Sequence, residues 1–137
     1  MKDLTTGIMT LFNTDNNFKT IIDGRLFKAR VPVGTPLPYA VFFVVSDTQD
    51  DTFKDTISEV LIQFSLFSGS SSTAEVEDMY AELKALYDDA QFTVTGNKII
   101  TMTRQYAGFL NSPFDTIEGT EEVFQYDVDY QCYLQKT

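Results

Sequence analysis

Residues 60–67 read Val-Leu-Ile-Gln-Phe-Ser-Leu-Phe, and their alternation decides the fold class. Successive side chains of a β-strand point to opposite faces, so a period of two predicts a strand with two different faces. The more apolar face holds Val60, Ile62, Phe64 and Leu66, and the other holds Leu61, Gln63, Ser65 and Phe67. The earlier stretch 39–45, Tyr-Ala-Val-Phe-Phe-Val-Val, is apolar throughout, which is typical of a strand covered on both faces. We expect these two strands to be neighbours in one sheet.

Residues 72–88 carry the clearest helical pattern. Ser72 and Glu75 stand at the spacing of a capping box, which marks the beginning of a helix. The apolar residues that follow share one helical face, namely Val76, Met79, Tyr80, Leu83 and Leu86. A weaker pattern over residues 4–12 predicts a short N-terminal helix, and residues 18–22 predict a further turn.

Other strands are predicted from short apolar or alternating stretches at 25–30, 92–94, 98–106 and 123–134. Two long polar stretches, Asp47 to Glu59 and Gly108 to Glu122, are expected to be loops, and long loops often carry function. The order of helices and strands lacks regular βαβ alternation. The predicted fold class is therefore α+β, with a mostly antiparallel sheet of about four to five strands flanked by the N-terminal helix and one long amphipathic helix. With 137 residues and no repeat, the chain is expected to form a single domain, residues 1–137.

The charge balance excludes several kinds of partner. Twenty acidic and ten basic residues give a net charge of -10, whereas affinity for nucleic acid depends on cations that displace counterions from phosphates. The same sign disfavours anionic lipid, and no apolar stretch approaches the roughly 20 residues that span a bilayer. The N-terminus also lacks the apolar segment of a secretory signal. We expect a soluble protein that stays in the compartment where it is made.

The motifs of familiar enzyme classes are missing from the sequence. The chain has no histidine, no phosphate-binding glycine loop and no nucleophile elbow. Its single cysteine, Cys132, lies in an alternating stretch and is expected to be a small buried side chain. Asp127 and Asp129 remain candidates for a catalytic carboxylate pair, but they alternate with apolar residues as on the wet face of a strand. We expect no enzyme activity and no cofactor.

The first polar stretch contains a run of carboxylates, Asp47, Asp50, Asp51 and Asp55. A calcium loop requires carboxylates at alternate positions, a central glycine and a closing glutamate, and this stretch lacks that pattern. No metal site is therefore expected. The alternatives are a solvated loop and a loop that contacts another chain.

Two features favour assembly with other copies of the chain. Basic residues gather between positions 19 and 30, where they are either scattered surface charge or a patch that meets an acidic surface of a neighbour. The predicted sheet also has more apolar surface than two helices can cover, and uncovered apolar surface usually marks an interface. The interface residues predicted on these grounds are Lys19, Arg25, Lys28, Arg30, Phe42, Leu61 and Phe67.

Two stretches resemble a known family. Residues 23–27, Asp-Gly-Arg-Leu-Phe, and residues 33–42, Val-Gly-Thr-Pro-Leu-Pro-Tyr-Ala-Val-Phe, are similar to the stretch G-R-I-Y … P-x-G-T-P-L-P-Y-V-V of tail-completion, or tail-terminator, proteins of long-tailed, siphovirus-like bacteriophages. The later order of strand, helix and closing strand is similar as well. The resemblance covers nearly the whole chain, although the stretches after Asp47 and Gly108 are long for the family.

The resemblance implies a structural virion protein at the head–tail junction, synthesised in the host cytoplasm. Proteins of this family form a ring, usually hexameric, that caps the tail tube, stops its growth and joins the head, so the implied partners are further copies, the tube protein and a head-completion or neck protein. DNA would pass through without specific binding, repelled by the acidic ring, and we expect Asp47, Asp50, Asp51 and Asp55 to line the lumen or a ring face. The alternatives are a head-completion or connector-associated neck protein and, from another class, a carboxylate-based hydrolase.

Overall fold

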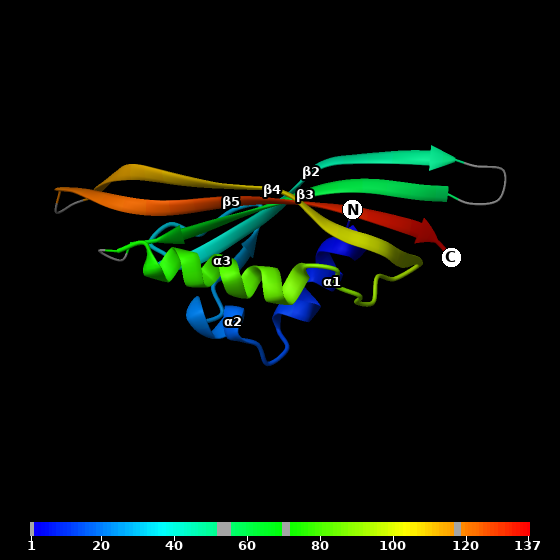
Figure 1. The fold of residues 1–137 in the computed structure, drawn as a ribbon, viewed down its shortest axis with the longest axis horizontal. Helices are drawn as coiled ribbons and strands as arrows, with labels where there is room; N and C mark the ends of the chain where they lie inside the picture. The colour runs from blue at the N-terminus through cyan, green and yellow to red at the C-terminus, as the bar shows by residue number, and fades with distance from the viewer. Residues whose placement is uncertain (1, 52–55, 70–71, 117–118) are drawn as a thin grey trace.

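In a computed structural model, which describes residues 2–51, 56–69, 72–116 and 119–137, a sheet carries all its helices on one side (Figure 1). The elements are α1 (Lys2–Phe12), α2 (Asn17–Ile21), β1 (Leu26–Lys28), β2 (Tyr39–Asp51), β3 (Thr56–Ser68), α3 (Ala74–Tyr87), β4 (Asn97–Thr116) and β5 (Gly119–Lys136). The five-stranded sheet has the order β1-β2-β3-β5-β4. Among the residues described, no helix lies on the opposite side of the sheet.

The sheet is mixed rather than purely antiparallel. β1 pairs with β2 in parallel, whereas β2 with β3, β3 with β5 and β4 with β5 are antiparallel. The parallel pair arises because residues 29–38 return the chain to the start of β1 before β2 begins. The predicted fold class was right in its α+β character and largely antiparallel sheet, and it missed the parallel pair.

The helices cover the sheet with apolar side chains at helical spacing. α1 buries Leu4, Ile8 and Phe12, one turn apart, and α3 buries Val76, Met79, Leu83 and Tyr87. The sheet contributes the alternate residues Val60, Ile62, Phe64 and Leu66 of β3 and Val128, Tyr130, Cys132 and Leu134 of β5. These side chains form one continuous core between the helices and one face of the sheet.

The polar stretches predicted as loops are mainly parts of strands. β2 continues to Asp51 and β3 begins at Thr56, so Asp47 pairs with Val60 and Asp51 with Thr56. In the same way β4 continues to Thr116 and β5 begins at Gly119. Sequence reasoning failed here because polar side chains were taken as a sign of loops, whereas strand pairing satisfies the backbone whatever the side chains are.

Two smaller predictions were also wrong. Residues 92–94 form no strand, and only Val94 makes an isolated bridge, to Asn97. The long helix begins at Ala74 with Thr73, not Ser72, as its N-cap residue, and the carboxylate of Glu75 accepts a hydrogen bond of 2.6 Å from the hydroxyl of Ser68. The helix is thereby joined at its first turn to the end of β3.

Candidate functional site: the uncovered sheet face and the two flanks

The outer face of the sheet, defined as the face opposite the helices, has an apolar part over β2 and β3. The rings of Tyr39 and Phe67 lie 5.2 Å apart between centroids. Val41, Phe43 and Leu61 lie on the same face by strand alternation, and all five side chains are half-buried. The sequence prediction that Leu61 and Phe67 point away from the chain's own core therefore agrees with the fold.

Phe42 lies on the other face. It is fully buried, and its ring centroid is 5.6 Å from that of Phe64 in the core. A side chain without exposed surface is not available to a neighbouring copy. The predicted interface therefore loses Phe42, which the sequence analysis included because residues 39–45 gave no alternation to distinguish the two faces.

The part of the outer face over β3 and β5 carries three carboxylates, those of Glu59, Asp127 and Asp129, which accept hydrogen bonds from uncharged side chains. We call this row the carboxylate ladder. Asp127 accepts hydrogen bonds of 2.8 Å from both Ser65 and Gln125. Asp129 accepts one of 3.0 Å from Gln63, and Glu59 accepts from Gln131 and, at 3.2 Å, from Tyr133. No cation pairs with these carboxylates among the described residues. The ladder cross-links neighbouring strands and leaves the face negatively charged.

This ladder accounts for Asp127 and Asp129 as structural side chains. Both occupy the outer face by alternation with the buried Val128 and Tyr130, and each is engaged by a donor from β3. Within the described part of the chain, no cluster of three potential ligand side chains could hold a metal ion. The buried thiol of Cys132 lies on the opposite face, and burial raises its pKa to about 12.

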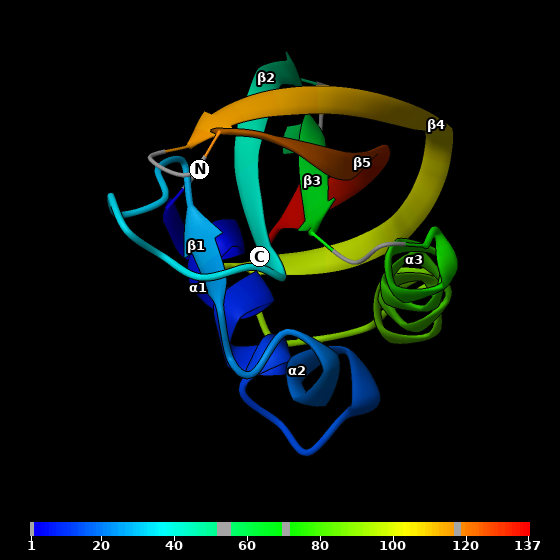
Figure 2. The ribbon, with the colours of Figure 1, turned by 90° about the vertical axis from the view of Figure 1, so that its left-hand side faces the viewer.

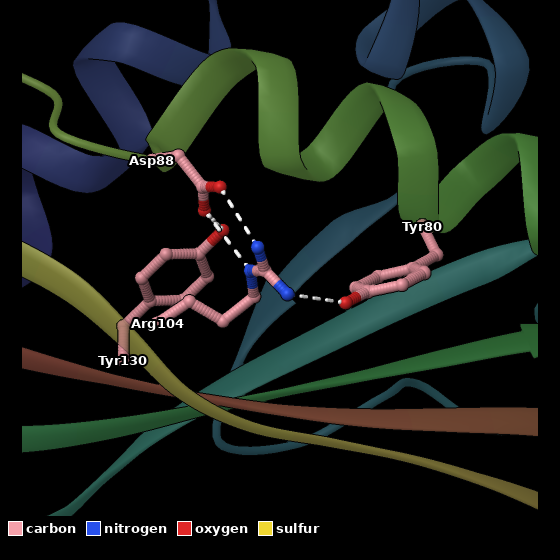
Figure 3. A network of polar contacts seen from close by, with 4 residues as sticks. All are labelled: Tyr80, Asp88, Arg104 and Tyr130. Atoms are coloured by element: carbon pink, nitrogen blue, oxygen red, sulfur yellow. Dashed lines mark hydrogen bonds and ion pairs between the residues drawn. The ribbon is translucent and has the colours of Figure 1, made fainter.

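A second polar network, on the helix side, fastens the end of α3 to the sheet (Figure 3). The carboxylate of Asp88 accepts hydrogen bonds from the guanidinium of Arg104 in β4, at 3.3 and 3.4 Å, and from the hydroxyl of Tyr130 in β5. Arg104 also donates to the hydroxyl of Tyr80, at 2.7 Å. Hydrogen bonding to Asp88 raises the pKa of Arg104. The pKa of Tyr130 is also raised, mainly by burial and to a smaller extent by the hydrogen bond to Asp88.

An aromatic row continues from this network along the β4–β5 hairpin. The ring of Tyr80 stacks on Tyr126 at 4.8 Å, and the ring of Phe109 lies 5.5 Å from Tyr126 and 5.7 Å from Phe124. Phe109 is nonetheless 44% exposed, and the neighbouring Tyr106 and Leu110 are 57% and 49% exposed. Sequence reasoning missed Phe109 and Leu110 because they lie in the stretch Gly108 to Glu122, which was predicted to be a loop.

The predicted basic residues separate into two pairs. Arg25 is engaged within the chain, since it donates to the carbonyl of Pro38 at 2.9 Å and pairs with Asp23, and Lys19 donates to the carbonyl of Asn13 at 3.4 Å. Lys28 and Arg30 are exposed and form no ion pair with any described residue. Of the predicted patch, these two cations are available to a partner.

The predicted acidic loop is the far end of the β2–β3 hairpin. Asp47 is exposed on β2, Asp50 and Asp51 are strand positions paired with Ile57 and Thr56, and Asp55 lies outside the described residues. Figure 1 shows this end of the hairpin beyond the helices, opposite to the end where the β4–β5 hairpin extends. The two hairpins thus extend in opposite directions along the sheet.

None of the helices in the described part of the chain is both long enough and apolar enough to cross a membrane. A hollow of about 510 Å³ is open to solvent and lies against α2 and the segment that joins it to α1, lined by polar residues such as Asn13, Asp15 and Lys19. Its polar lining is unlike the mostly apolar lining of a typical small-molecule site. The sheet face and the flanks are therefore the better functional candidates.

Comparison with known proteins agrees with this architecture. A chain in the solved structure titled "Virion of native gene transfer agent (GTA) particle" superposes with a TM-score of 0.76 at 9% sequence identity, over 96% of this chain and 94% of that one. At that identity the likeness shows the fold. No curated protein sequence matches the chain.

The family model described as "Tail completion protein gp17" matches residues 6–134. The match includes α3, β1 to β4 and all but the last two residues of β5, and with them the uncovered sheet face. The chain therefore belongs to the tail completion protein gp17 family, and it is a structural protein of a bacteriophage tail, located in the virion.

Proposed function

We propose that this chain forms a closed, hexameric ring that caps the end of the phage tail tube, stops its growth and provides the surface to which the head is joined. The partners are further copies of the chain, the tube protein and a head-completion or neck protein. The proposal deepens the family assignment, which establishes a tail protein and leaves its position and assembly open.

The uncovered outer face is the observation that carries the proposal. It exposes a continuous sheet with half-buried Leu61 and Phe67 at one side and the carboxylate ladder at the other. A soluble domain seldom leaves such a face bare unless something else covers it or unless it lines a channel. A ring of copies provides both possibilities, because it brings each copy beside another and encloses a lumen.

The negative charge suits a passage for DNA. A net charge of -10 in each copy makes the ring strongly acidic, and phosphates are repelled by a surface on which carboxylates outnumber cations. We propose that the hairpin carrying Asp47, Asp50, Asp51 and Asp55 lines the lumen or a ring face. An image of the assembled ring at residue detail with these positions on the outer wall would contradict this part of the proposal.

Deletion of the gene tests the proposed role directly. Without a terminator, tube subunits keep adding, so the expected lysate contains overlong tubes without heads, measured by electron microscopy of tail lengths. Supply of the wild-type chain from a plasmid should restore tails of uniform length. Overlong tubes that persist despite this supply would show that the deletion acted on another gene.

The same experiment separates the alternative of a head-completion or neck protein. Loss of a head-closing component leaves tails of normal length beside heads that have lost DNA. Normal tails in the deletion lysate would therefore favour that alternative and refute termination of the tube.

A further inference from the structure

The chain has opposite charges on its two flanks. Figure 2, a view along the sheet, shows β1 on one flank, with α1 behind it, and α3 on the other flank, with α2 between them. The strand order agrees, because β1 and β4 are the two edges of the sheet and α3 is fastened to β4 through Asp88 and Arg104. The two flanks are therefore separate surfaces that one copy could present to two different neighbours.

The β1 flank, defined as residues 25–30, is basic. Its sequence, Arg-Leu-Phe-Lys-Ala-Arg, contains no acidic residue. Strand alternation places Lys28 on the same face as the buried Leu26, which is the helix side of the sheet. Lys28 and the nearby Arg30 are both exposed, and neither has an acidic partner among the described residues.

The second surface, which we call the α3 face, is acidic, and its other side chains are small. It consists of the solvent-facing residues Ala74, Glu77, Asp78, Ala81 and Ala85. Glu77 and Asp78 are exposed, and within the described part of the chain neither has an ion-pair partner. The only cation in the helix, Lys84, lies 4.5 Å from the centroid of the Tyr80 ring rather than beside these carboxylates. The alanines allow another chain to approach closely.

The two charged surfaces lie in the same layer of the molecule. α3 packs on the helix side of the sheet, and Lys28 projects to that side as well. In a ring with rotational symmetry, one flank of each copy meets the other flank of the next copy, so the two flanks must be complementary to each other. Opposite charges on opposite flanks of one chain, in one layer, satisfy this condition.

We propose that neighbouring copies in the ring contact each other through the β1 flank of one copy and the α3 face of the next, with Lys28 and Arg30 facing Glu77 and Asp78. This inference rests on the proposed ring and adds which surfaces form it. The occupant of the α3 face is a second copy of this chain. The charges set the register and exclude wrong partners, which is the main contribution of charged residues at an interface.

Reversal of the charges tests the contact more sharply than truncation to alanine. An exposed ion pair at the rim of an interface contributes little to the binding free energy, so its loss has a small effect, whereas like charges that face each other repel. The first variant is K28E/R30E, whose two flanks are both acidic. The second is E77K/D78K, whose two flanks are both basic. K98E/K136E is the matched control for the first variant, since it makes the same change of charge at two exposed residues that lie beside each other where β4 begins and β5 ends.

The assay adds purified protein to tail tubes assembled without this chain and measures, by electron microscopy, capped ends and further growth of the tubes. Wild type and the control should cap the tubes. Each flank variant alone should need a concentration higher by roughly tenfold or more. An equal mixture of the two variants should cap again, because acidic and basic copies alternate around a ring with an even number of members.

The mixture also controls for folding, because an unfolded variant is not rescued by a partner. If wild type caps and each variant alone caps equally well, or if the mixture fails as the single variants do, the assigned contact is wrong and the ring proposal stands. If wild type itself neither caps tubes nor stops their growth, the proposed function fails, and the assigned contact fails with it.

Discussion

The hydroxyl of Tyr130 lies 2.5 Å from Oδ1 of Asp88, and it joins a buried strand residue to the residue that ends α3. The same carboxylate accepts a hydrogen bond from the guanidinium of Arg104 in the edge strand β4. One side chain thus holds a helix and two strands together at the place where β4 passes the helix and continues into its hairpin (Figure 3).

Asp88→Ala should lower the free energy of unfolding by about 1–3 kcal/mol, because it leaves the Tyr130 hydroxyl buried without its acceptor. The ion pair with Arg104 adds little, since both side chains are about a third exposed, at 35% and 34%. Urea unfolding measures the change, with Asp15→Ala, at an exposed residue, as the control. Equal stability of the two variants would contradict a structural role for Asp88.

Gly7→Ala should destabilise the protein, although alanine normally stabilises a helix relative to glycine by about 1 kcal/mol. A Cβ at Gly7 would lie 2.8 Å from the carbonyl oxygen of Thr93 and 2.9 Å from the ring of Phe92. Relief of this overlap requires movement of the backbone, which costs about 1–3 kcal/mol. The control is Thr6→Ala on the exposed side of α1, and a rise in melting temperature for Gly7→Ala would refute the close approach.

Stability should fall at alkaline pH. Burial raises the pKa values of Tyr87 and Tyr130, whereas an unfolded tyrosine titrates near about 10. As pH rises through that value the unfolded chain releases phenolic protons that the folded chain keeps, so the unfolded state is favoured. The stabilising contribution is therefore complete below about pH 9 and decreases above it.

Urea midpoints between neutral and alkaline pH, followed with tyrosinate absorbance, measure this decrease. Tyr87→Phe should weaken the dependence, because it removes one of the two buried phenols while it also loses the hydrogen bond of 3.0 Å to the carbonyl of Ile8. A midpoint that stays constant to strongly alkaline pH would be incompatible with two buried phenols.

Cys132 should resist thiol reagents in the folded protein. Its side chain has no exposed surface, and burial raises its pKa to about 12, so the reactive thiolate is rare at neutral pH. Labelling with a chromogenic disulfide should proceed only in denaturant. Rapid labelling of the native protein would mean that β5 opens readily, and Cys132→Ser, which cannot be labelled, gives the background rate.

The sequence predicted the parts of the fold that have strong periodicity. Alternation over Val60 to Leu66 marked the buried face of β3, and the spacing of Val76, Met79 and Leu83 marked the buried side of α3. The parallel pairing of β1 was not predictable, because three residues carry too little pattern to specify a partner or a direction. The hairpin ends were missed because their polar side chains conceal backbone pairing.

The residues of the candidate site were likewise predictable only where the local sequence has a clear period. Leu61 and Phe67 were assigned to the uncovered face by alternation, whereas Phe42 lies in a stretch that is apolar on both faces and was misplaced. The network of Asp88, Arg104, Tyr80 and Tyr130 joins residues up to 50 positions apart in the chain, and no local spacing indicates such a meeting. Contacts of this kind depend on the assembled fold.

The pairing of β3 with β5 has a mechanical consequence. β3 belongs to one hairpin and β5 to the other, and they are joined from Ile57 and Gln135 at one end to Ser68 and Phe124 at the other. Opposed tension on the two hairpins would pull these strands lengthwise past each other, and ladder hydrogen bonds stand perpendicular to that direction. The load would fall on all the hydrogen bonds between β3 and β5 at once instead of breaking them one after another, so the two hairpins would resist being pulled apart.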